Sequence, residues 1–260
     1  VITRLTVELT GIPEQVRGGR AIFGSLDDAA SAVADAVQSG VDVAKIELID
    51  AFSAEVSNDF LDTDLPDAPM VFVEFHANHG VEEEIAFCRA IFEAHDVQRF
   101  EVSEDDAEMR DLWEARRELA EAFEPYDPDL SPLTPGDITV PISNYPDVVD
   151  YAKRLGDDYD VPVACFGHAG DGNVHYFVMV DPDDPEMVAD GEEISKKLVE
   201  RAIDLGGTAT GEHGIGIGKR DHLRTEYDDA TVDTMQAIKD TLDPNGILNP
   251  GKIFPEDEQD

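Results

Sequence analysis

Two apolar runs joined by a glycine-rich turn constrain the fold of this chain more than any other feature. Residues 161–167 and 174–180 each have the length and apolar content of a buried strand. The turn between them, 169–173, is too short for a crossover, so the two runs are predicted to pair as an antiparallel hairpin. Any sheet in this protein therefore contains antiparallel strands.

The rest of the chain alternates short strand-like runs with amphipathic segments. Ser25 is typical of a helix N-cap, and Gly40 ends the segment that follows it. Further strands are predicted at 3–10, 20–24, 43–49, 70–75, 97–102 and 137–141. Helices are predicted at 26–39, 81–95, 186–205 and 229–242. One more helix is predicted to begin at 103, and another, after the strand at 137–141, to end at about 156. We therefore predict an α+β fold with an antiparallel or mixed sheet and helices packed on one face. Two ferredoxin-like halves, 1–100 and 101–260, are part of this prediction.

The charge balance limits the classes of partner. The chain has 260 residues with 19 Lys and Arg against 59 Asp and Glu, which gives a net charge of −40. Nucleic acids and anionic membranes both need a basic face, so neither is expected as a partner. The hydrophobic share of 42% separates the chain from acidic disordered tails.

The acidic residues are spread along the whole chain, which favours a halophilic source. Screening by concentrated salt removes the self-repulsion that so much like charge creates. The protein is therefore expected to lose stability as salt is removed. Thermal melts from molar to low salt test this, and an unshifted, cooperative melt would contradict it.

The cysteines and the N-terminus indicate the compartment. Cys88 and Cys165 form no CxxC motif and lie in apolar runs, so both are predicted to be small core residues in a reducing interior. No secretory signal or membrane-spanning run is recognisable. We expect a cytoplasmic protein, which partners could bring to the inner face of the membrane. Because the chain begins with Val1 in a strand-like pattern, we also expect it to be part of a longer protein.

The hairpin turn carries two histidines. A hairpin over 161–180 would bring His168 and His175 to the same end of adjacent strands, where two imidazoles can share a divalent metal. The alternative is a pair of solvated turn residues. Spacing alone leaves both interpretations open.

A second glycine-rich segment runs from Gly207 to Lys219. Five glycines over 207–218 are costly to order, and one explanation is a ligand close to the backbone. A phosphate-binding P-loop is excluded because Arg220, instead of Ser or Thr, follows Lys219. Glu212 could complete a two-histidine, one-carboxylate site, leaving His213 as a base or proton shuttle. The alternative is a flexible loop with an incidental acid and histidine.

These two segments and a third, 242–252, together resemble a known family. The strings Gly-His-Ala-Gly-Asp-Gly-Asn-Val-His at 167–175, Gly-Glu-His-Gly at 211–214 and Asn-Pro-Gly-Lys at 249–252 are similar to the C-terminal domain of FAD-linked oxidases. This group includes D-lactate dehydrogenases, flavin subunits of glycolate oxidase and D-2-hydroxyglutarate dehydrogenases. The resemblance spans nearly the whole chain, 1–260, and implies an N-terminal FAD-binding domain outside it.

The resemblance implies a reaction and a role for each site residue. The reaction is oxidation of a 2-hydroxy acid to a 2-oxo acid with hydride transfer to FAD, for which the chain alone is expected to be inactive. The implied base is His213, the implied ligands of zinc or manganese are His168, His175 and Glu212, the implied carboxylate-binding residue is Arg116, and the residue implied to lie near the flavin is Asn249. Apart from the resemblance, Lys219 is also predicted to bind substrate, because cations near the site must offset the acidic charge that would repel an anionic substrate. Arg116 could instead pair with a neighbouring helix acid, and Arg117 competes for its role. Asn249 could simply be a turn residue.

Two departures from the family pattern bear on the substrate. Some relatives carry a lysine just before the strand at Asp137, where this chain has Thr134-Pro135-Gly136. The position two after His175 is often polar in relatives, and here it is Phe177. Both favour a lactate- or glycolate-like substrate over a dicarboxylate.

Two other classes of function compete with this interpretation. One is a stand-alone metal-binding or metal-hydrolase module built on His168, His175 and Glu212. The other is a non-catalytic module that docks an iron–sulfur electron-transfer partner, which the intact His213 and Glu212 disfavour.

Overall fold

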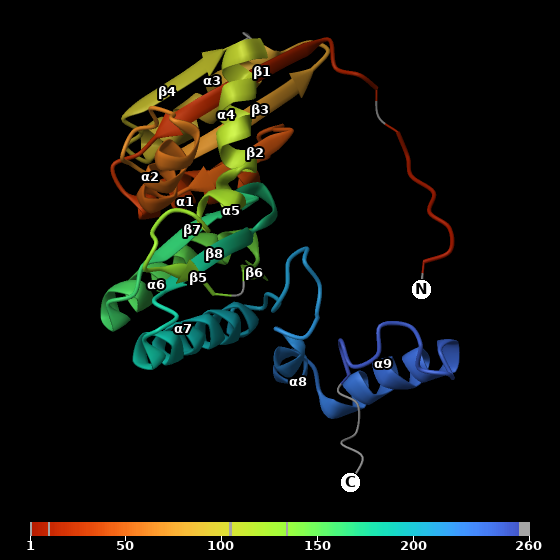
Figure 1. Ribbon diagram of the computed structural model, residues 1–260. Coiled ribbons are helices and arrows are strands. Elements are labelled where there is room, and N and C mark those ends of the chain that lie inside the picture. Colours follow the sequence, from red (N-terminus) through yellow and green to blue (C-terminus); the bar gives the residue numbers. More distant parts are fainter. Residues whose placement is uncertain (1, 10, 104–105, 134, 255–260) are drawn as a thin grey trace.

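A single antiparallel sheet with helices on both faces forms the body of the molecule (Figure 1). The computed structural model describes residues 2–9, 11–103, 106–133 and 135–254, without the side chains of 106–108, 111 and 112. The strands are β1 (Gln15–Ile22), β2 (Lys45–Ile49), β3 (Met70–Ala77), β4 (Arg99–Ser103), β5 (Ser131–Pro132), β6 (Gly136–Thr139), β7 (Val163–Gly167) and β8 (Asn173–Val180). The helices are α1 (Leu26–Gln38), α2 (Ala51–Leu61), α3 (Val81–Ala94), α4 (Asp106–Arg117), α5 (Leu119–Ala122), α6 (Tyr145–Tyr159), α7 (Pro185–Asp204), α8 (Leu223–Glu226) and α9 (Asp229–Leu242).

The sheet contains two groups of strands whose connections resemble the ferredoxin-like pattern, while the predicted division into halves 1–100 and 101–260 stays a prediction. The first half runs β1-α1-β2-β3-α3-β4, with α2 inserted between β2 and β3, and its strands lie in the order β4-β1-β3-β2. The second half runs β6-α6-β7-β8-α7, and Thr208 then bridges to Thr139 where a fourth strand would lie. Antiparallel pairing of β2 with β7 joins the halves. The predicted α+β class and antiparallel sheet are confirmed.

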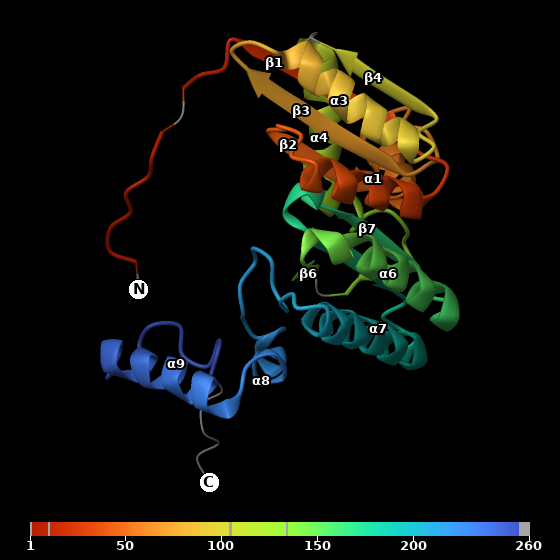
Figure 2. The same ribbon diagram turned by 180° about the vertical axis from the view of Figure 1, so that it is seen from behind.

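Two hydrophobic layers cover the sheet. Helices α1, α3, α6 and α7 pack on one face, as Figure 2 shows from behind. Helices α2, α4 and α5 pack on the other face over Ile49, Met70, Phe72, Phe166 and Phe177. The prediction of helices on one face was therefore incomplete. The central strands are apolar on both sides, which requires a second covering layer.

Several predicted elements are confirmed and others shift. Ser25 caps α1 by accepting a hydrogen bond from the Asp28 N–H at 3.1 Å. The strand predicted at 20–24 is β1, which begins earlier and contains Gly18 because Met109 of α4 packs where a β-carbon would lie. Cys88 and Cys165 are buried and unpaired, as expected.

The strand predicted at 3–10 is wrong for the part that is described. Residues 3–9 have no regular secondary structure and are exposed, with 86% of the surface of Leu9 accessible. Alternating apolar residues favour a strand, but a strand needs a neighbour to satisfy its backbone groups. No described strand pairs with this segment.

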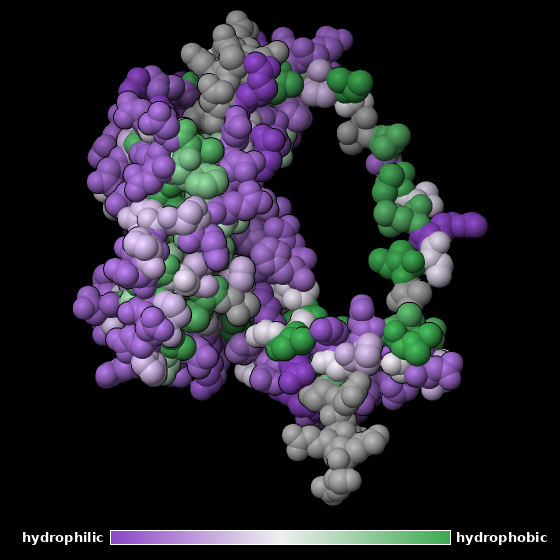
Figure 3. Space-filling view, viewed as in Figure 1, coloured by the Kyte–Doolittle hydropathy of each residue, from purple (hydrophilic) through white to green (hydrophobic). Residues whose placement is uncertain are grey.

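Exposed apolar side chains gather at the two ends of the described chain. They include Leu5 and Leu9 near the N-terminus and Ile238, Leu242 and Ile247 in and after α9 (Figure 3). Both ribbon views place α9 apart from the sheet (Figures 1 and 2). No helix among the described residues is long and apolar enough to span a membrane.

Candidate active site

The β7–β8 hairpin places two histidines at one end of the sheet, as the sequence predicted. His168 follows directly after β7, and His175 lies in β8 opposite Phe166. Gly172 in the turn has a φ of +71°, and a β-carbon there would lie 2.1 Å from the carbonyl oxygen of Val140. Only glycine combines this backbone conformation with so close an approach. The imidazole rings lie 5.2 Å apart, centroid to centroid.

Glu212 closes the site from the second glycine-rich segment. Its Oε1 lies 3.2 Å from Nε2 of His168 and 3.2 Å from Nε2 of His175. One donor atom from each of these three residues falls within 4.8 Å of the others, a spacing that a metal ion could bridge. Two imidazole nitrogens and one carboxylate oxygen suit zinc or manganese. The three predicted ligands are therefore brought together.

A buried carboxylate, Asp137 of β6, holds the loop that carries Glu212. Asp137 is fully buried, and its oxygens accept hydrogen bonds from the N–H groups of His213 at 2.9 Å and Glu212 at 3.1 Å. They also accept bonds from the Thr210 hydroxyl and the Asn173 amide. Burial alone would raise the pKa of Asp137, but these donors hold it well below its usual range. Asp137 is thus a charged anchor.

The ring of His213 lies beside the three candidate ligands. It stacks on His175 with a centroid distance of 5.2 Å and an interplanar angle of 16°. About half of its side chain is exposed. Asp137, His175 and His213 form a second group with metal-compatible spacing. Because both oxygens of Asp137 already accept hydrogen bonds, the first group is the better candidate for holding a metal ion.

The two candidate ligand histidines have opposite pKa shifts. A hydrogen bond from His168 to Glu47 raises the pKa of His168. Burial, followed by the charges of Arg116 and His168, lowers the pKa of His175 to about 4. His175 is therefore a neutral imidazole at physiological pH, with a lone pair available for a cation.

Helix α4 brings Arg116 toward the same end of the sheet. The guanidinium of Arg116 lies over the ring of Phe166, 5.2 Å from its centroid, and its Nε donates to Oε2 of Glu47 at 3.0 Å. Arg116 and His168 line a cavity of about 580 Å³ that also includes Trp113 and Lys45. Trp113 packs edge-on against Phe72. The alternative interpretation, an ion pair of Arg116 with a helix acid, is not what is seen: its partner is Glu47 of β2.

The two remaining predicted residues lie differently. The Nζ of Lys219 donates to the backbone carbonyls of Asp137 at 2.6 Å and Ala209 at 3.1 Å, so it anchors the loop from inside. Asn249 is exposed in the segment after α9 and has a left-handed backbone with a φ of +48°. Binding of substrate by Lys219 and contact of Asn249 with a flavin stay predictions.

Comparison with known proteins identifies the family. Residues 12–253 match the model of the family described as FAD linked oxidases, C-terminal domain. The chain belongs to this family. It is 32% identical over 257 residues to a probable mitochondrial D-lactate dehydrogenase of Danio rerio, covering 98% of this chain and 51% of that protein. It is also 32% identical over 263 residues to glycolate oxidase subunit GlcD of Escherichia coli K12, again covering 98% of this chain and 51% of the relative.

Solved structures share the fold. The 4-ethylphenol oxidase of Gulosibacter chungangensis superposes with a TM-score of 0.67 at 18% identity, over 97% of this chain and 56% of that one. A p-cresol methylhydroxylase gives a TM-score of 0.67 at 14% identity, over 95% of this chain and 54% of the other. The chain thus spans about half the length of the proteins it matches.

Two residues of this FAD-linked oxidase domain were missed as site residues by sequence reasoning. Glu47 and Asp137 are acids within strands, and both are almost fully buried beside the histidines. A charged residue in an otherwise apolar strand is the available signal, because an acid is rarely buried unless it is paired. Ile46-Glu47-Leu48 carries that signal, but the sequence alone does not reveal which donors meet the acid.

At two positions in the loop 207–218, packing within the chain explains the glycine without any ligand. A β-carbon at Gly211 would lie 1.9 Å from the Asn173 amide nitrogen, and one at Gly207 would lie 2.0 Å from the Thr139 carbonyl oxygen. Both glycines are required by packing of the chain against itself. Gly214 and Gly216 have open space around them.

Replacing Gly211 by alanine is therefore expected to destabilise the domain and displace Glu212. The added methyl overlaps Asn173 and Thr139, and overpacking of this kind costs about 1–3 kcal/mol. Urea unfolding measures the loss, and Gly216→Ala is the matched control because nothing lies within 4 Å of its β-carbon position. Equal stability of the two variants would contradict the packing.

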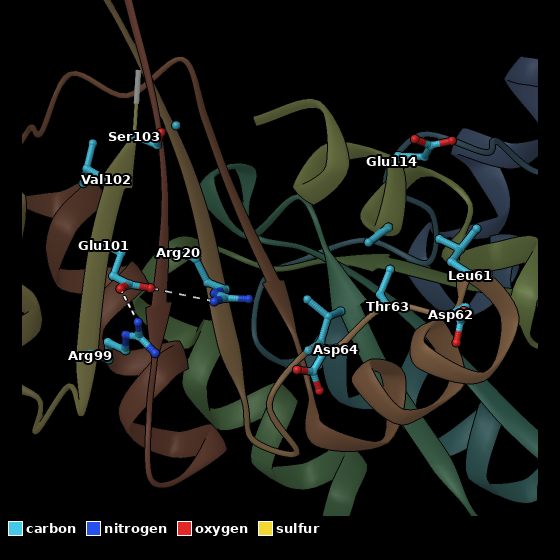
Figure 4. Close-up of a pocket in the computed structure, with 13 residues that line it drawn as sticks. Arg20, Leu61, Asp62, Thr63, Asp64, Arg99, Glu101, Val102, Ser103 and Glu114 are labelled. Atoms are coloured by element: carbon cyan, nitrogen blue, oxygen red, sulfur yellow. Dashed lines mark hydrogen bonds and ion pairs between the residues drawn. The ribbon is translucent and has the colours of Figure 1, made fainter. Parts of the chain in front are cut away.

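A larger cavity, about 930 Å³, lies along α4 without any of the site histidines. Arg20, Asp62, Asp64 and Glu114 line it, and Glu101 pairs with Arg20 at 3.8 Å and with Arg99 (Figure 4). Basic and acidic side chains both line this cavity, so its charge does not select an anionic or a cationic ligand. Among the residues described, imidazoles, a carboxylate and a guanidinium converge only at the 580 Å³ cavity and the neighbouring β7–β8 hairpin.

Proposed function

We propose that this chain is the substrate-binding C-terminal part of a flavin-dependent 2-hydroxy-acid dehydrogenase. The observation that carries the proposal is the convergence of His168, His175 and Glu212, with His213 stacked beside them. Membership of the FAD-linked oxidase family supports the reaction type. The names of its D-lactate dehydrogenase and glycolate oxidase relatives support a small 2-hydroxy acid, lactate- or glycolate-like, as substrate.

The residues fit a divalent ion. Each histidine directs Nε2 toward Glu212, while its Nδ1 faces a buried carboxylate: Glu47 lies 2.6 Å from His168, and Asp137 lies 3.8 Å from His175. Carboxylates behind ligand histidines are the usual support of metal sites. His168, His175 and Glu212 would hold the ion, zinc or manganese in this proposal. When bound, it would make the substrate hydroxyl more acidic and orient it.

Each residue then has a defined task. His213 takes the hydroxyl proton as the C–H bond delivers its hydride, and Arg116 pairs with the substrate carboxylate. FAD, which we assign mainly to an N-terminal domain outside this chain, supplies the hydride acceptor. An iron–sulfur partner and a cytoplasmic location, with partners at the inner membrane face, stay predictions of the resemblance and of the unpaired cysteines.

The test compares this chain with the same chain preceded by the FAD-binding segment that we expect its gene to encode. The longer protein should reduce an artificial acceptor with D-lactate or glycolate, and the 260-residue chain should not. Oxidation by the chain alone would contradict the assignment. Hydrolysis of esters or phosphates by the chain alone would favour the metal-hydrolase alternative.

The metal site has its own measurement. His168→Ala removes one of three ligands, so elemental analysis should find the metal of the wild type lost. His95→Ala is the control, because His95 pairs with Asp35 on the helical face. Equal metal content in His168→Ala and wild type would remove His168 from the site.

A further inference from the structure

One buried carboxylate joins two parts of the candidate site. Glu47 lies in the middle of β2 and is 8% exposed. Its Oε1 lies 2.6 Å from Nδ1 of His168, and its Oε2 accepts the Nε–H of Arg116 at 3.0 Å. The first partner follows β7 and the second belongs to α4. Glu47 therefore connects the hairpin with the helix that crosses this face of the sheet.

The bond to Glu47 fixes which nitrogen of His168 is protonated. Both carboxylates beside His168, Glu47 and Glu212, offer only acceptors, and a neutral imidazole has a single N–H hydrogen. The contact of Nδ1 with Glu47 is 2.6 Å, against 3.2 Å for Nε2 with Glu212, so we assign the hydrogen to Nδ1. The hydrogen-free nitrogen is then Nε2, which is the atom that faces Glu212 at 3.2 Å. The opposite tautomer would aim a hydrogen at the place where a cation would sit.

The same carboxylate orients Arg116. It occupies the Nε edge of the guanidinium, and Nη2 lies 3.0 Å from the same Oε2. Nη2 is nevertheless buried without a hydrogen-bond partner among the described residues, because the angles do not suit a bond. A buried donor in this state carries a desolvation cost that a further acceptor would relieve.

We propose that Glu47 is a positioning residue that fixes His168 in the Nδ1–H tautomer and holds Arg116 of α4 in place. The inference rests on the proposed function, since it assigns His168 to a divalent ion and Arg116 to the substrate carboxylate. The two carboxylate oxygens of Glu47 are engaged by His168 and Arg116, so Glu47 acts through these two residues. It sets the geometry of both sides of the site at once, and α4 is thereby coupled to the hairpin.

The Glu47→Gln variant of this chain tests the proposal. The amide has one acceptor oxygen, whereas both partners are donors, so only one of the two bonds survives. If the amide oxygen stays with Arg116, its NH₂ group faces His168 and moves the imidazole hydrogen to Nε2. Zinc affinity, measured by chelator competition, should fall about 10–100-fold. In nitrogen NMR spectra of the metal-free protein at alkaline pH, His168 should change from the Nδ1–H to the Nε2–H tautomer.

Glu74→Gln is the matched control. Glu74 is a similarly buried acid on the neighbouring strand β3, but it pairs with Lys45 and His76. It should leave the His168 tautomer and the zinc affinity unchanged. An unchanged tautomer and affinity in Glu47→Gln would overturn the proposal.

The wild-type spectrum keeps the proposal falsifiable even if Glu47→Gln does not fold. Finding His168 as the Nε2–H tautomer in the wild type would overturn it. If the wild type binds no zinc but His168 changes tautomer in Glu47→Gln, the metal part of the proposed function fails. The positioning by Glu47 is then still supported.

Discussion

Replacing Asp137 by alanine is expected to lower the free energy of unfolding by about 3–5 kcal/mol, the usual cost of removing one partner of a buried ion pair. The variant would leave the buried hydrogen-bond donors of His213, Thr210 and Asn173 without an acceptor. It would also leave the mostly buried ammonium of Lys219 without its carboxylate 3.6 Å away. The loop that carries Glu212 and His213 should detach from β6, so metal binding should fall with stability.

Urea unfolding in EDTA measures this loss without a contribution from metal. The control is Asp150→Asn, which removes an exposed acid paired with Arg154 at 2.8 Å on α6. An exposed pair of this kind is worth about 0–1 kcal/mol. If Asp137→Ala is no less stable than Asp150→Asn, the anchoring role of Asp137 is wrong.

The pKa of Asp137 predicts how the difference in unfolding free energy between the wild type and Asp137→Asn depends on pH. Burial opposes the charged form. The backbone N–H of His213, the side-chain amide of Asn173, the Thr210 hydroxyl and the charge of Lys219 nevertheless hold the pKa of Asp137 below its unfolded value of about 3.9. A depressed pKa stabilises the folded state above the unfolded pKa, and this contribution is lost as pH falls toward the folded pKa. The gap between wild type and Asp137→Asn should therefore be full at neutral pH and shrink below about pH 4.

Replacing His213 by glutamine is expected to lower kcat of the flavin-containing protein about 10²–10⁴-fold, the usual contribution of a general base. Metal content should stay that of the wild type, because His213 lies outside the three candidate ligands. This combination separates a lost base from a lost metal site. It is measured by steady-state kinetics together with elemental analysis.

His222→Gln is the matched control for this variant. His222 lies in the short helical turn before α8 and belongs to neither metal-compatible group. Its replacement should leave kcat unchanged. Wild-type kcat in His213→Gln would exclude His213 as the base, and loss of metal in that variant would assign it a different role.

The sequence determined the antiparallel hairpin and most strands and long helices. These follow from local patterns of apolar residues and turn glycines. The three candidate metal ligands came from the family resemblance, and spacing alone left their role open. The sequence did not reveal that α2, α4 and α5 form a second helical layer. The pattern within a helix does not say which face of the sheet the helix will cover.

The tertiary structure alone decided what surrounds the ligands. Glu47 meets His168 across 121 residues of chain, and Asp137 meets the His213 backbone across 76. No local pattern encodes such contacts, because they arise where β2, β6, β7 and β8 bring their ends together. Lys219 shows the same limit: the sequence does not reveal that its ammonium group donates to the backbone carbonyls of Asp137 and Ala209. The sequence named the groups at the site, and the pairing of strands chose their partners.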